Sequence, residues 1–258
     1  MALAAGAGSM VLDRGECRKH HETLASDVYT MPLASEIELF ALIGEYEKSL
    51  SMMRSHRFRI WEGGEGLHTT FVDANVLRGF ELLKAKEPAR ARAFFEAAAE
   101  FPLNLEAKKY YAGGRSSEVF YNQGVFYEAA GEAERARQAF EKAVAERQYY
   151  HSYGVPHYYR GEALKKLGRS EEAKPLFEAL IKRGLRELAD IETSTGIGFF
   201  AKFGDLLTDE IRGSNAHYLV GLGYLGLEDR TRAKAEFKQA AGLDMYNLWA
   251  KVMLSRLE

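Results

Sequence analysis

The sequence predicts an all-α fold, a solenoid of stacked antiparallel helix pairs, because of an internal repeat. Four times a glycine is followed three residues later by Leu or Tyr, twelve later by Ala, sixteen later by Phe and nineteen later by Ala or Leu. Apolar residues at helical spacing on both sides of a turn predict a helix pair, and repetition of the unit predicts a stack. The four copies are centred on Gly79, Gly124, Gly161 and Gly221.

Each position of the repeat has a physical role. Glycine inside a helix costs about 1 kcal/mol relative to Ala, so we expect it where the second helix approaches closely, with the Ala facing it. The Phe is expected to fill the space toward the next pair. Gly131 and Gly168, seven residues after the repeat glycine, supply the positive φ at which a helix stops. In the last copy Glu228 occupies that position.

The remaining elements follow in order along the chain. Residues 1–30 are predicted to be poorly ordered or partly helical, and residues 31–258 form the helical domain. Ser35-Glu36-Ile37-Glu38 is a capping-box pattern that opens a short helix pair. The predicted elements are this pair (35–54), a glycine-rich loop (55–69), repeats (about 70–100, 115–147 and 152–182), an insertion with one irregular helix and a loop (183–213), the last repeat (213–245) and a C-terminal helix (246–258).

These spacings resemble the tetratricopeptide repeat over about residues 70–182 and 213–245. The resemblance implies a right-handed superhelix with a concave groove that binds protein partners.

Three stretches carry a narrower resemblance: RFRIWEGGEG (57–66), AEFPLNLEAKK (99–109) and the last repeat (216–244). They resemble the C-terminal part of large bacterial proteins that carry an N-terminal β-rich domain of unknown function. Glu106 stands where the family's Tyr-Pro-x-Asn-Leu-Gly motif has its glycine. The resemblance covers about residues 30–258. It implies that the chain is a fragment or a short relative, and it associates the chain with carbohydrate processing.

Composition narrows the function classes. A chain of 258 residues with 47% hydrophobic content can bury an ample core, and a net charge of -2 gives no footprint for nucleic acid or an anionic membrane. No apolar run approaches the roughly 18 residues that span a bilayer, and the opening MALAAGAGSM lacks the basic region of a signal peptide. The single cysteine, Cys17, fits a reducing compartment. We expect a cytoplasmic protein.

Motifs for cofactors and metals do not occur in the sequence. There is no HExxH, CxxC or glycine-rich phosphate motif, because GGRSS (113–117) lacks the P-loop Lys and TGIGFF (195–200) lacks a third glycine. YYHSYGVPHYY (149–159) is either a sugar-stacking surface or a seal between repeats, and its two histidines lack a short metal-ligand spacing. We expect no cofactor, no metal and no catalytic activity of the chain on its own.

Aromatic side chains mark the candidate groove. Tyr121, Tyr158 and Tyr218 each lie three residues before a repeat glycine, where a first helix faces the groove. They form either a ligand-binding ladder or part of the packing, since aromatic residues at helical spacing are usually core. Glu162 occupies the next groove position, whose counterparts Val125 and Leu222 are apolar. The Lys and Asn that clamp a peptide carboxylate are missing, which disfavours recognition of chaperone tails.

The loop HRFRIWEGGEGLH (56–68) is the second candidate site. Glu62 and Glu65 could lie within about 5–10 Å of each other, a range that covers the carboxylate pairs of sugar hydrolysis. The loop's aromatic and basic side chains could hold a ligand; otherwise the segment is a connector between two helical parts. The binding candidates in it are Trp61, His56 and Arg59.

Three functions are consistent with these features. The first is a non-catalytic interaction module that binds a protein partner or a β-rich domain, in the same chain or another. The second is an accessory role in bacterial carbohydrate processing, with the loop contributing to a carbohydrate site. The third is a scaffold that forms a homo-oligomer.

Overall fold

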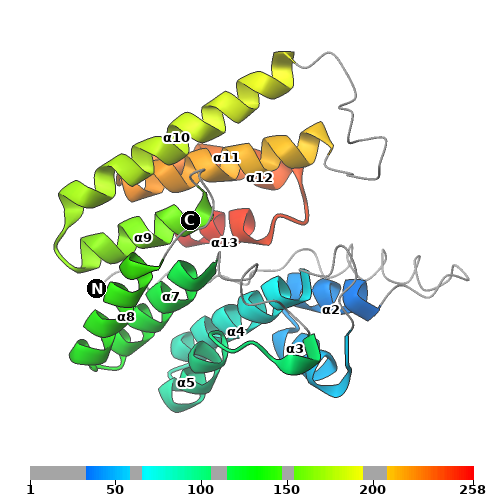
Figure 1. Ribbon diagram of the computed structural model, residues 1–258. Coiled ribbons are helices and arrows are strands. Elements are labelled where there is room, and N and C mark those ends of the chain that lie inside the picture. Colours follow the sequence, from blue (N-terminus) through cyan, green and yellow to red (C-terminus); the bar gives the residue numbers. More distant parts are fainter. Residues whose placement is uncertain (1–32, 59–65, 106–114, 147–153, 194–207) are drawn as a thin grey trace, which may run out of the picture. The chain divides into compact units, whose positions relative to one another are not determined.

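The computed structural model describes residues 33–58, 66–105, 115–146, 154–193 and 208–258 (Figure 1). Within these ranges the chain forms eleven α-helices and one short 3-10 helix, and it contains no strand there. The predicted all-α class is therefore confirmed. No helix of the described ranges is long and apolar enough to cross a membrane.

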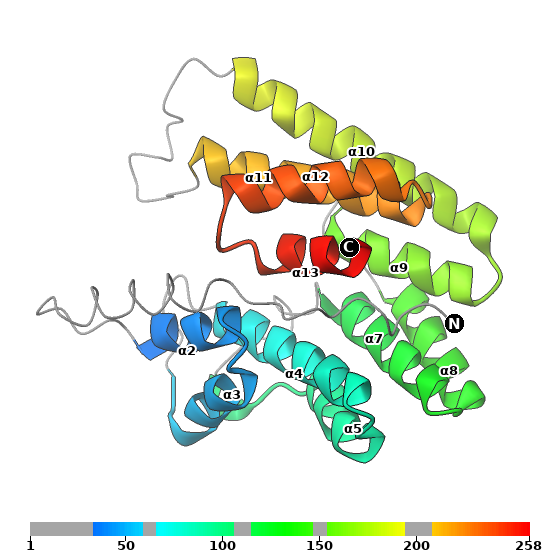
Figure 2. The same ribbon diagram turned by 180° about the vertical axis from the view of Figure 1, so that it is seen from behind.

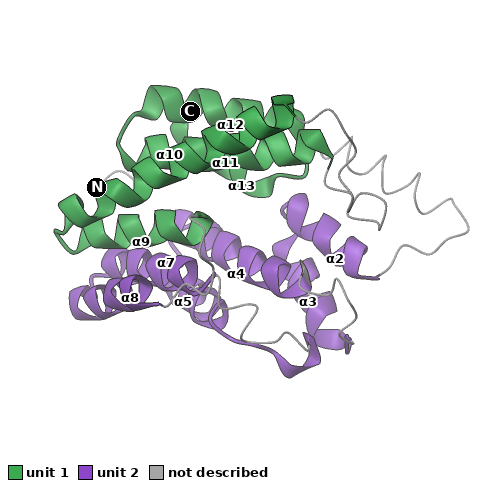
Figure 3. Ribbon diagram, turned by 45° about the horizontal axis from the view of Figure 1, so that its top comes forward, with its two compact units in different colours: residues 1–6, 147–258 green, residues 7–146 purple. Residues whose placement is uncertain are grey.

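The chain divides into two compact units (Figure 3). Unit 2 comprises Ala7–Glu146, and unit 1 comprises Arg147–Glu258 together with Met1–Gly6. Each unit is built from consecutive helices that pack against one another.

Unit 2 contains three helix pairs. A short 3-10 helix, η1, follows the second pair, and the next pair packs against the helices before it. The elements are α2 (Leu33–Leu42), α3 (Tyr46–Ser55), α4 (Gly66–Lys84), α5 (Pro88–Ala97), η1 (Leu103–Leu105), α7 (Ser116–Ala129) and α8 (Ala133–Ala145).

Unit 1 contains two helix pairs and a final helix, which packs against the second helix of the last pair (Figure 2). The elements are α9 (Val155–Lys166), α10 (Ser170–Thr193), α11 (Asp209–Gly226), α12 (Arg230–Leu243) and α13 (Leu248–Leu257).

The repeat glycines lie under the repeat phenylalanines. A Cβ atom added at any of the four glycines would meet the Phe ring sixteen residues later at 2.4–2.7 Å. We had expected the repeat Ala to face the glycine. The structure shows instead that the Phe of the same pair packs against it. Phe95 also reaches the next pair, since its ring stacks on Phe126 with centroids 5.2 Å apart. The absence of a side chain at the glycine is what lets the two helices of a pair approach.

All five helix pairs turn in the same way. The second residue after each first helix has a positive φ: Gly44, Lys86, Gly131, Gly168 and Glu228. The next residue donates its N–H to a carbonyl five residues back, as from Glu87 to Leu82 (2.8 Å) and from Asp229 to Tyr224 (2.9 Å). This is the Schellman arrangement, which satisfies the last carbonyl groups of a helix.

α10 and α11 pack backbone against backbone. A Cβ at Gly223 would meet Ile181 Cγ1 at 2.5 Å and the Phe177 carbonyl at 2.7 Å, and one at Gly184 would meet the Ala216 carbonyl at 2.7 Å. Because this contact extends along both helices, residues 183–193 of the expected insertion continue α10, and residues 209–213 begin α11. Residues 194–207 lie outside the described ranges.

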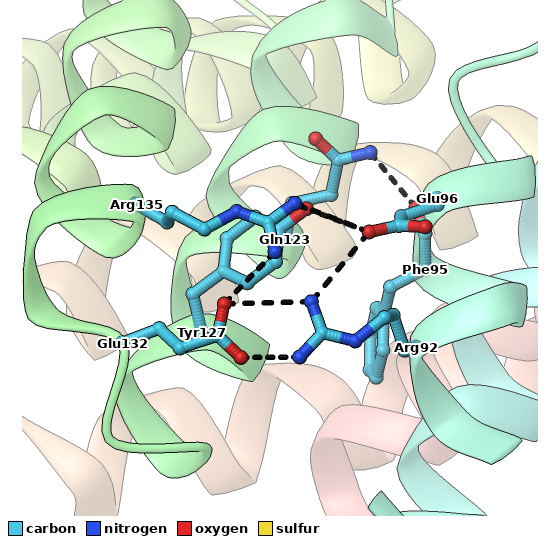
Figure 4. Close-up of polar contacts among 7 residues, drawn as sticks. All are labelled: Arg92, Phe95, Glu96, Gln123, Tyr127, Glu132 and Arg135. Carbon is cyan, nitrogen blue, oxygen red and sulfur yellow. Dashed lines mark hydrogen bonds and ion pairs between the residues drawn. The ribbon is translucent and has the colours of Figure 1, made fainter. Parts of the chain in front are cut away.

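Charged side chains join the α4/α5 and α7/α8 pairs (Figure 4). Arg92 of α5 pairs with Glu132 at the start of α8, and Arg135 of α8 contacts Glu96 of α5 at 3.3 Å. Gln123 of α7 donates to the Phe95 carbonyl at 2.9 Å. Hydrogen bonding to Arg92, and then to Arg135, lowers the pKa of the Glu132 carboxyl. The side chains of this network are partly exposed, so their ion pairs contribute little to stability. They mainly fix how the two helix pairs are oriented against each other.

Candidate functional site

The three candidate tyrosines occupy equivalent places in their pairs. Each ring lies 5.8–6.1 Å from the repeat Phe of its own pair, centroid to centroid. Tyr158 and Tyr218 are only 6% and 7% exposed, whereas Tyr121 is half-buried. This placement favours the packing interpretation for Tyr158 and Tyr218, and Tyr121 retains the most accessible ring of the three.

Glu162 lies between helices of unit 1. Its carboxylate is 3.4 Å from Lys165 Nζ, and the same ammonium group contacts Glu228 at 3.0 Å and the Gly226 carbonyl at 3.2 Å. Burial raises the pKa of Glu162, against the opposing charge of Lys165. The contacts of Lys165 connect α9 to the end of α11, and Glu162 contacts Lys165 within α9.

Most of the loop's candidate residues cannot be placed. Arg59, Trp61, Glu62 and Glu65 lie outside the described residues. His56 is exposed, and its Nδ1 lies 3.0 Å from both the Met52 carbonyl and Ser55 Oγ at the end of α3.

Asn104 joins the two motifs of the narrower resemblance. Its Nδ2 donates to the carbonyl groups of Met53 (2.6 Å) and His56 (2.9 Å), and its own carbonyl accepts from the Phe58 N–H (2.8 Å). The first residues of the loop are thereby fixed against η1. A single asparagine in the motif FPLNL thus holds the end of α3 in place.

His68, in the first turn of α4, is fixed at the other end of the loop. Its ring stacks on Phe101 with centroids 4.4 Å apart, and Nε2 lies 3.1 Å from the Glu100 carbonyl. Burial lowers its pKa; the hydrogen bond to Glu100 opposes this shift, and the charge of Arg115 adds to it. His68 is therefore neutral near pH 7.

Arg115 connects the first helices of two pairs. Its guanidinium contacts Asp73 of α4 at 2.5 Å and Glu118 of α7 at 2.8 Å, and Nη1 donates to the Thr69 carbonyl at 2.9 Å. Burial alone would lower the pKa of Arg115, but the two carboxylates outweigh it and raise the pKa well above its ordinary value. The side chains of Asp73 and Glu118 are 11% and 3% exposed.

Asp73 and Glu118 are equivalent residues of the repeat. Each lies six residues before its repeat glycine, and Glu118 lies one helical turn before Tyr121, on the same side of α7. The sequence analysis did not single out this pair. The signal was visible, because two copies of the repeat carry a carboxylate at the same position of their first helix.

Buried polar side chains concentrate around this pair. Ten polar or charged residues of the described ranges are buried, and seven of them lie in the first halves of α4 and α7. Burial of polar groups costs free energy unless they are hydrogen-bonded, so polar contacts such as those of Arg115 add to the apolar packing at this end of unit 2. The seven are His68, Thr70, Asp73, Asn75, Ser117, Glu118 and Asn122.

Metal-binding chemistry has no support in the described ranges. No group of three or more His, Cys, Asp or Glu side chains there could hold an ion. In the cluster around Arg115, the carboxylates of Asp73 and Glu118 are paired with the guanidinium group. The cluster therefore shows ion pairing and hydrogen bonding.

Comparison with known families matches two segments of the chain to the tetratricopeptide repeat, residues 118–147 and 157–183. The first segment covers most of α7 and all of α8, and the second covers most of α9 and the first half of α10. These are the copies centred on Gly124 and Gly161. They are the two copies that also have a glycine, Gly131 or Gly168, at the turn seven residues later. The chain therefore contains tetratricopeptide repeats, as the spacing predicted.

Proposed function

We propose that this tetratricopeptide-repeat protein is a non-catalytic interaction module that binds a protein partner on the first helices of its pairs. Repeats of this kind commonly mediate contacts between proteins. The observation that carries the proposal for unit 2 is the row formed by Asp73, Arg115, Glu118 and Tyr121 on α4 and α7.

The row suits recognition for two reasons. Its largely buried carboxylates and Arg115 hold the start of α7 in place, so little conformational entropy is lost when a partner binds beside them. Tyr121 adds a half-buried aromatic ring, and such rings contribute large contact area at interfaces. A β-rich domain, in the same chain or in another, is the partner that the narrower resemblance suggests.

The proposal is tested by affinity purification with quantitative mass spectrometry. The tagged full chain should enrich one or more proteins, and Tyr121→Arg should abolish their enrichment. Gln138→Arg, an exposed change on α8, serves as the matched control and should leave the enrichment intact. Equal enrichment by wild type and Tyr121→Arg, with circular dichroism showing both folded, would refute binding at this row.

A carbohydrate-binding role for the loop is the second candidate. It is favoured by the contacts that fix the described residues on both sides of the loop: Asn104 holds the chain up to Phe58, and His68 holds the start of α4. A loop between fixed ends is a preferred place for a binding site, and Trp61, Glu62 and Glu65 are its candidate residues.

Oligosaccharide binding measured by calorimetry separates this role from the first. Glu62→Gln and Glu65→Gln should each weaken binding without changing protein enrichment, whereas Tyr121→Arg should do the reverse. Binding that is unchanged in both Gln variants would reject the loop as the site. A molar mass of twice the chain mass in light scattering, with no enriched partner, would instead favour the self-associating scaffold.

A further inference from the structure

α12 carries a row of three basic side chains on its exposed face. Arg230, Lys234 and Lys238 follow one another at intervals of four residues, so they lie on one side of the helix. All three are exposed. Within the part of the chain that the structure describes, none of them forms an ion pair or a side-chain hydrogen bond.

This row differs from the comparable exposed row on α10, Lys174, Lys182 and Arg186, because Glu178 lies on the same face between Lys174 and Lys182. Single basic residues of the second helices, Arg90, Arg137 and Arg183, each have a carboxylate three or four residues away at 2.5–2.7 Å, and Arg232 beside the row has Asp229 at 2.5 Å. The only carboxylate on α12 is Glu236, and it contacts His217 of α11 at 2.7 Å. The row therefore projects positive charge that no side chain of α12 neutralises.

Folding of α12 does not require these charges. Like charges four residues apart destabilise a helix, and the row contains two such pairs. Arg230 is also the first residue of the helix, where the helix dipole favours a negative charge. A row that opposes helix formation and forms no ion pair or side-chain hydrogen bond within the described ranges is better explained by a binding role than by a folding role.

Apolar side chains follow the row at the end of the helix. Leu243, Met245 and Tyr246 are 40%, 42% and 47% exposed, and they are three of the five large hydrophobic residues exposed in the described ranges. Met and Tyr are enriched in protein interfaces. Lys251 Nζ donates to the Met245 carbonyl at 2.5 Å, which adds a further positive charge beside this turn.

We propose that the α12 surface, defined as Arg230, Lys234, Lys238 and the turn 243–246, binds an acidic segment of a partner protein that also carries apolar side chains. Carboxylates at the spacing of a helical turn complement the basic row, and an apolar residue beyond them covers the exposed turn. This surface uses other helices than the row proposed for α4 and α7, so the two sites can be tested separately.

The test measures fluorescence anisotropy with the full chain and a labelled helical peptide. The peptide has glutamate at every fourth position, with leucine and phenylalanine after the last glutamate. It should bind, and binding should weaken when the salt concentration rises from about 0.05 M to about 0.3 M. The triple variant R230E/K234E/K238E should bind roughly tenfold or more weakly. Met245→Ala with Tyr246→Ala should weaken binding roughly threefold or more without any change of charge.

The control variant K174E/K182E/R186E makes the same charge change at exposed residues of α10. It should bind within about twofold of wild type. An equal loss in the two triple variants would show unspecific attraction and would overturn the proposal. So would tighter binding of a DNA duplex than of the peptide, or no peptide binding by the wild type.

A stability measurement tests the other part of the inference. Lys234→Glu replaces two repulsive pairs by two attractive ones, so it should raise Tm while it weakens peptide binding. A lower Tm would show that α12 needs the lysine for folding, and the argument for a binding role would fail.

Discussion

At single residues, the turns of the repeat show that a backbone conformation can persist without its usual amino acid. Gly131 and Gly168 were recognisable because glycine adopts a positive φ without steric cost. Lys86 and Glu228 adopt φ values of 62° and 67° at the same register position, where L-residues are strained. The turns at Gly131 and Gly168 could therefore be predicted from the glycine itself. The turns at Lys86 and Glu228 could be predicted only from their position in the repeat.

Replacement of Lys86 by glycine should stabilise the protein. The substitution removes the left-handed strain, and within the described ranges the exposed side chain of Lys86 has no hydrogen bond or ion pair to lose. We expect the free energy of unfolding to rise by about 0.5–1 kcal/mol, measured by urea denaturation. Glu228→Gly should gain less, because it also removes the contact with Lys165. A loss of stability in Lys86→Gly would contradict the strain argument.

Replacement of Gly124 by alanine should destabilise the protein although alanine favours helices. The new Cβ would lie 2.4 Å from the Phe140 ring, and overpacking of this kind costs about 1–3 kcal/mol, more than the helix propensity returns. Phe140→Leu in the same chain should recover part of the loss in a double-mutant cycle. Gly242→Ala, in open space on α12, is the matched control and should be neutral or stabilising.

At the level of helices, α4 and α7 are distinguished by the buried polar side chains in their first halves. The hydrophobic pattern predicted both helices but could not indicate that Arg115 would reach back across 42 residues to Asp73. Nor could it indicate that Asn104 would hold the end of α3. Such contacts depend on how consecutive pairs pack, and a pattern within one helix carries no information about them.

The buried histidine of α4 predicts a pH dependence of stability. An unfolded His68 titrates near 6.5, whereas burial lowers the pKa of the folded residue. Below about pH 6.5 the unfolded state therefore binds a proton that the native state does not, so stability should fall as pH falls. His157 has a lowered pKa for the same first reason, burial, and should add to the effect.

Unfolding free energies measured between about pH 5 and pH 7 check this sign. His68→Gln should flatten the curve because the proton-binding group is gone, and adding His157→Gln should flatten it further. A full slope in the double variant would assign the dependence to other groups.

For the whole chain, the sequence repeat was informative because stacked pairs reuse the same few contacts. It predicted the helix pairs and the close helix approach at the repeat glycines, but it left open whether the three tyrosines form a ligand ladder or part of the packing. It did not predict how far α10 and α11 extend, since residues 183–193 lack the repeat spacing and are helical through their packing on α11. The loop candidates Trp61, Glu62 and Glu65 remain predictions from sequence.

Contacts between neighbouring pairs should control how cooperatively a repeat protein unfolds, because its stability is roughly a sum of unit and interface contributions. In unit 1 that interface is the glycine contact of α10 with α11. Gly223→Ala places a Cβ 2.7 Å from a backbone carbonyl, which cannot rotate away as a side chain can. We expect a loss of about 3 kcal/mol or more, larger than for Gly124→Ala.

Hydrogen exchange should locate the damage. Amides of α11, α12 and α13 should lose protection before those of α9, and thermal unfolding of unit 1 should separate into two steps. Uniform loss of protection across α9 to α13 would show instead that unit 1 unfolds as one block. In that case its pairs would be coupled by the apolar core beneath Phe177 and Phe237 more strongly than by the glycine contact.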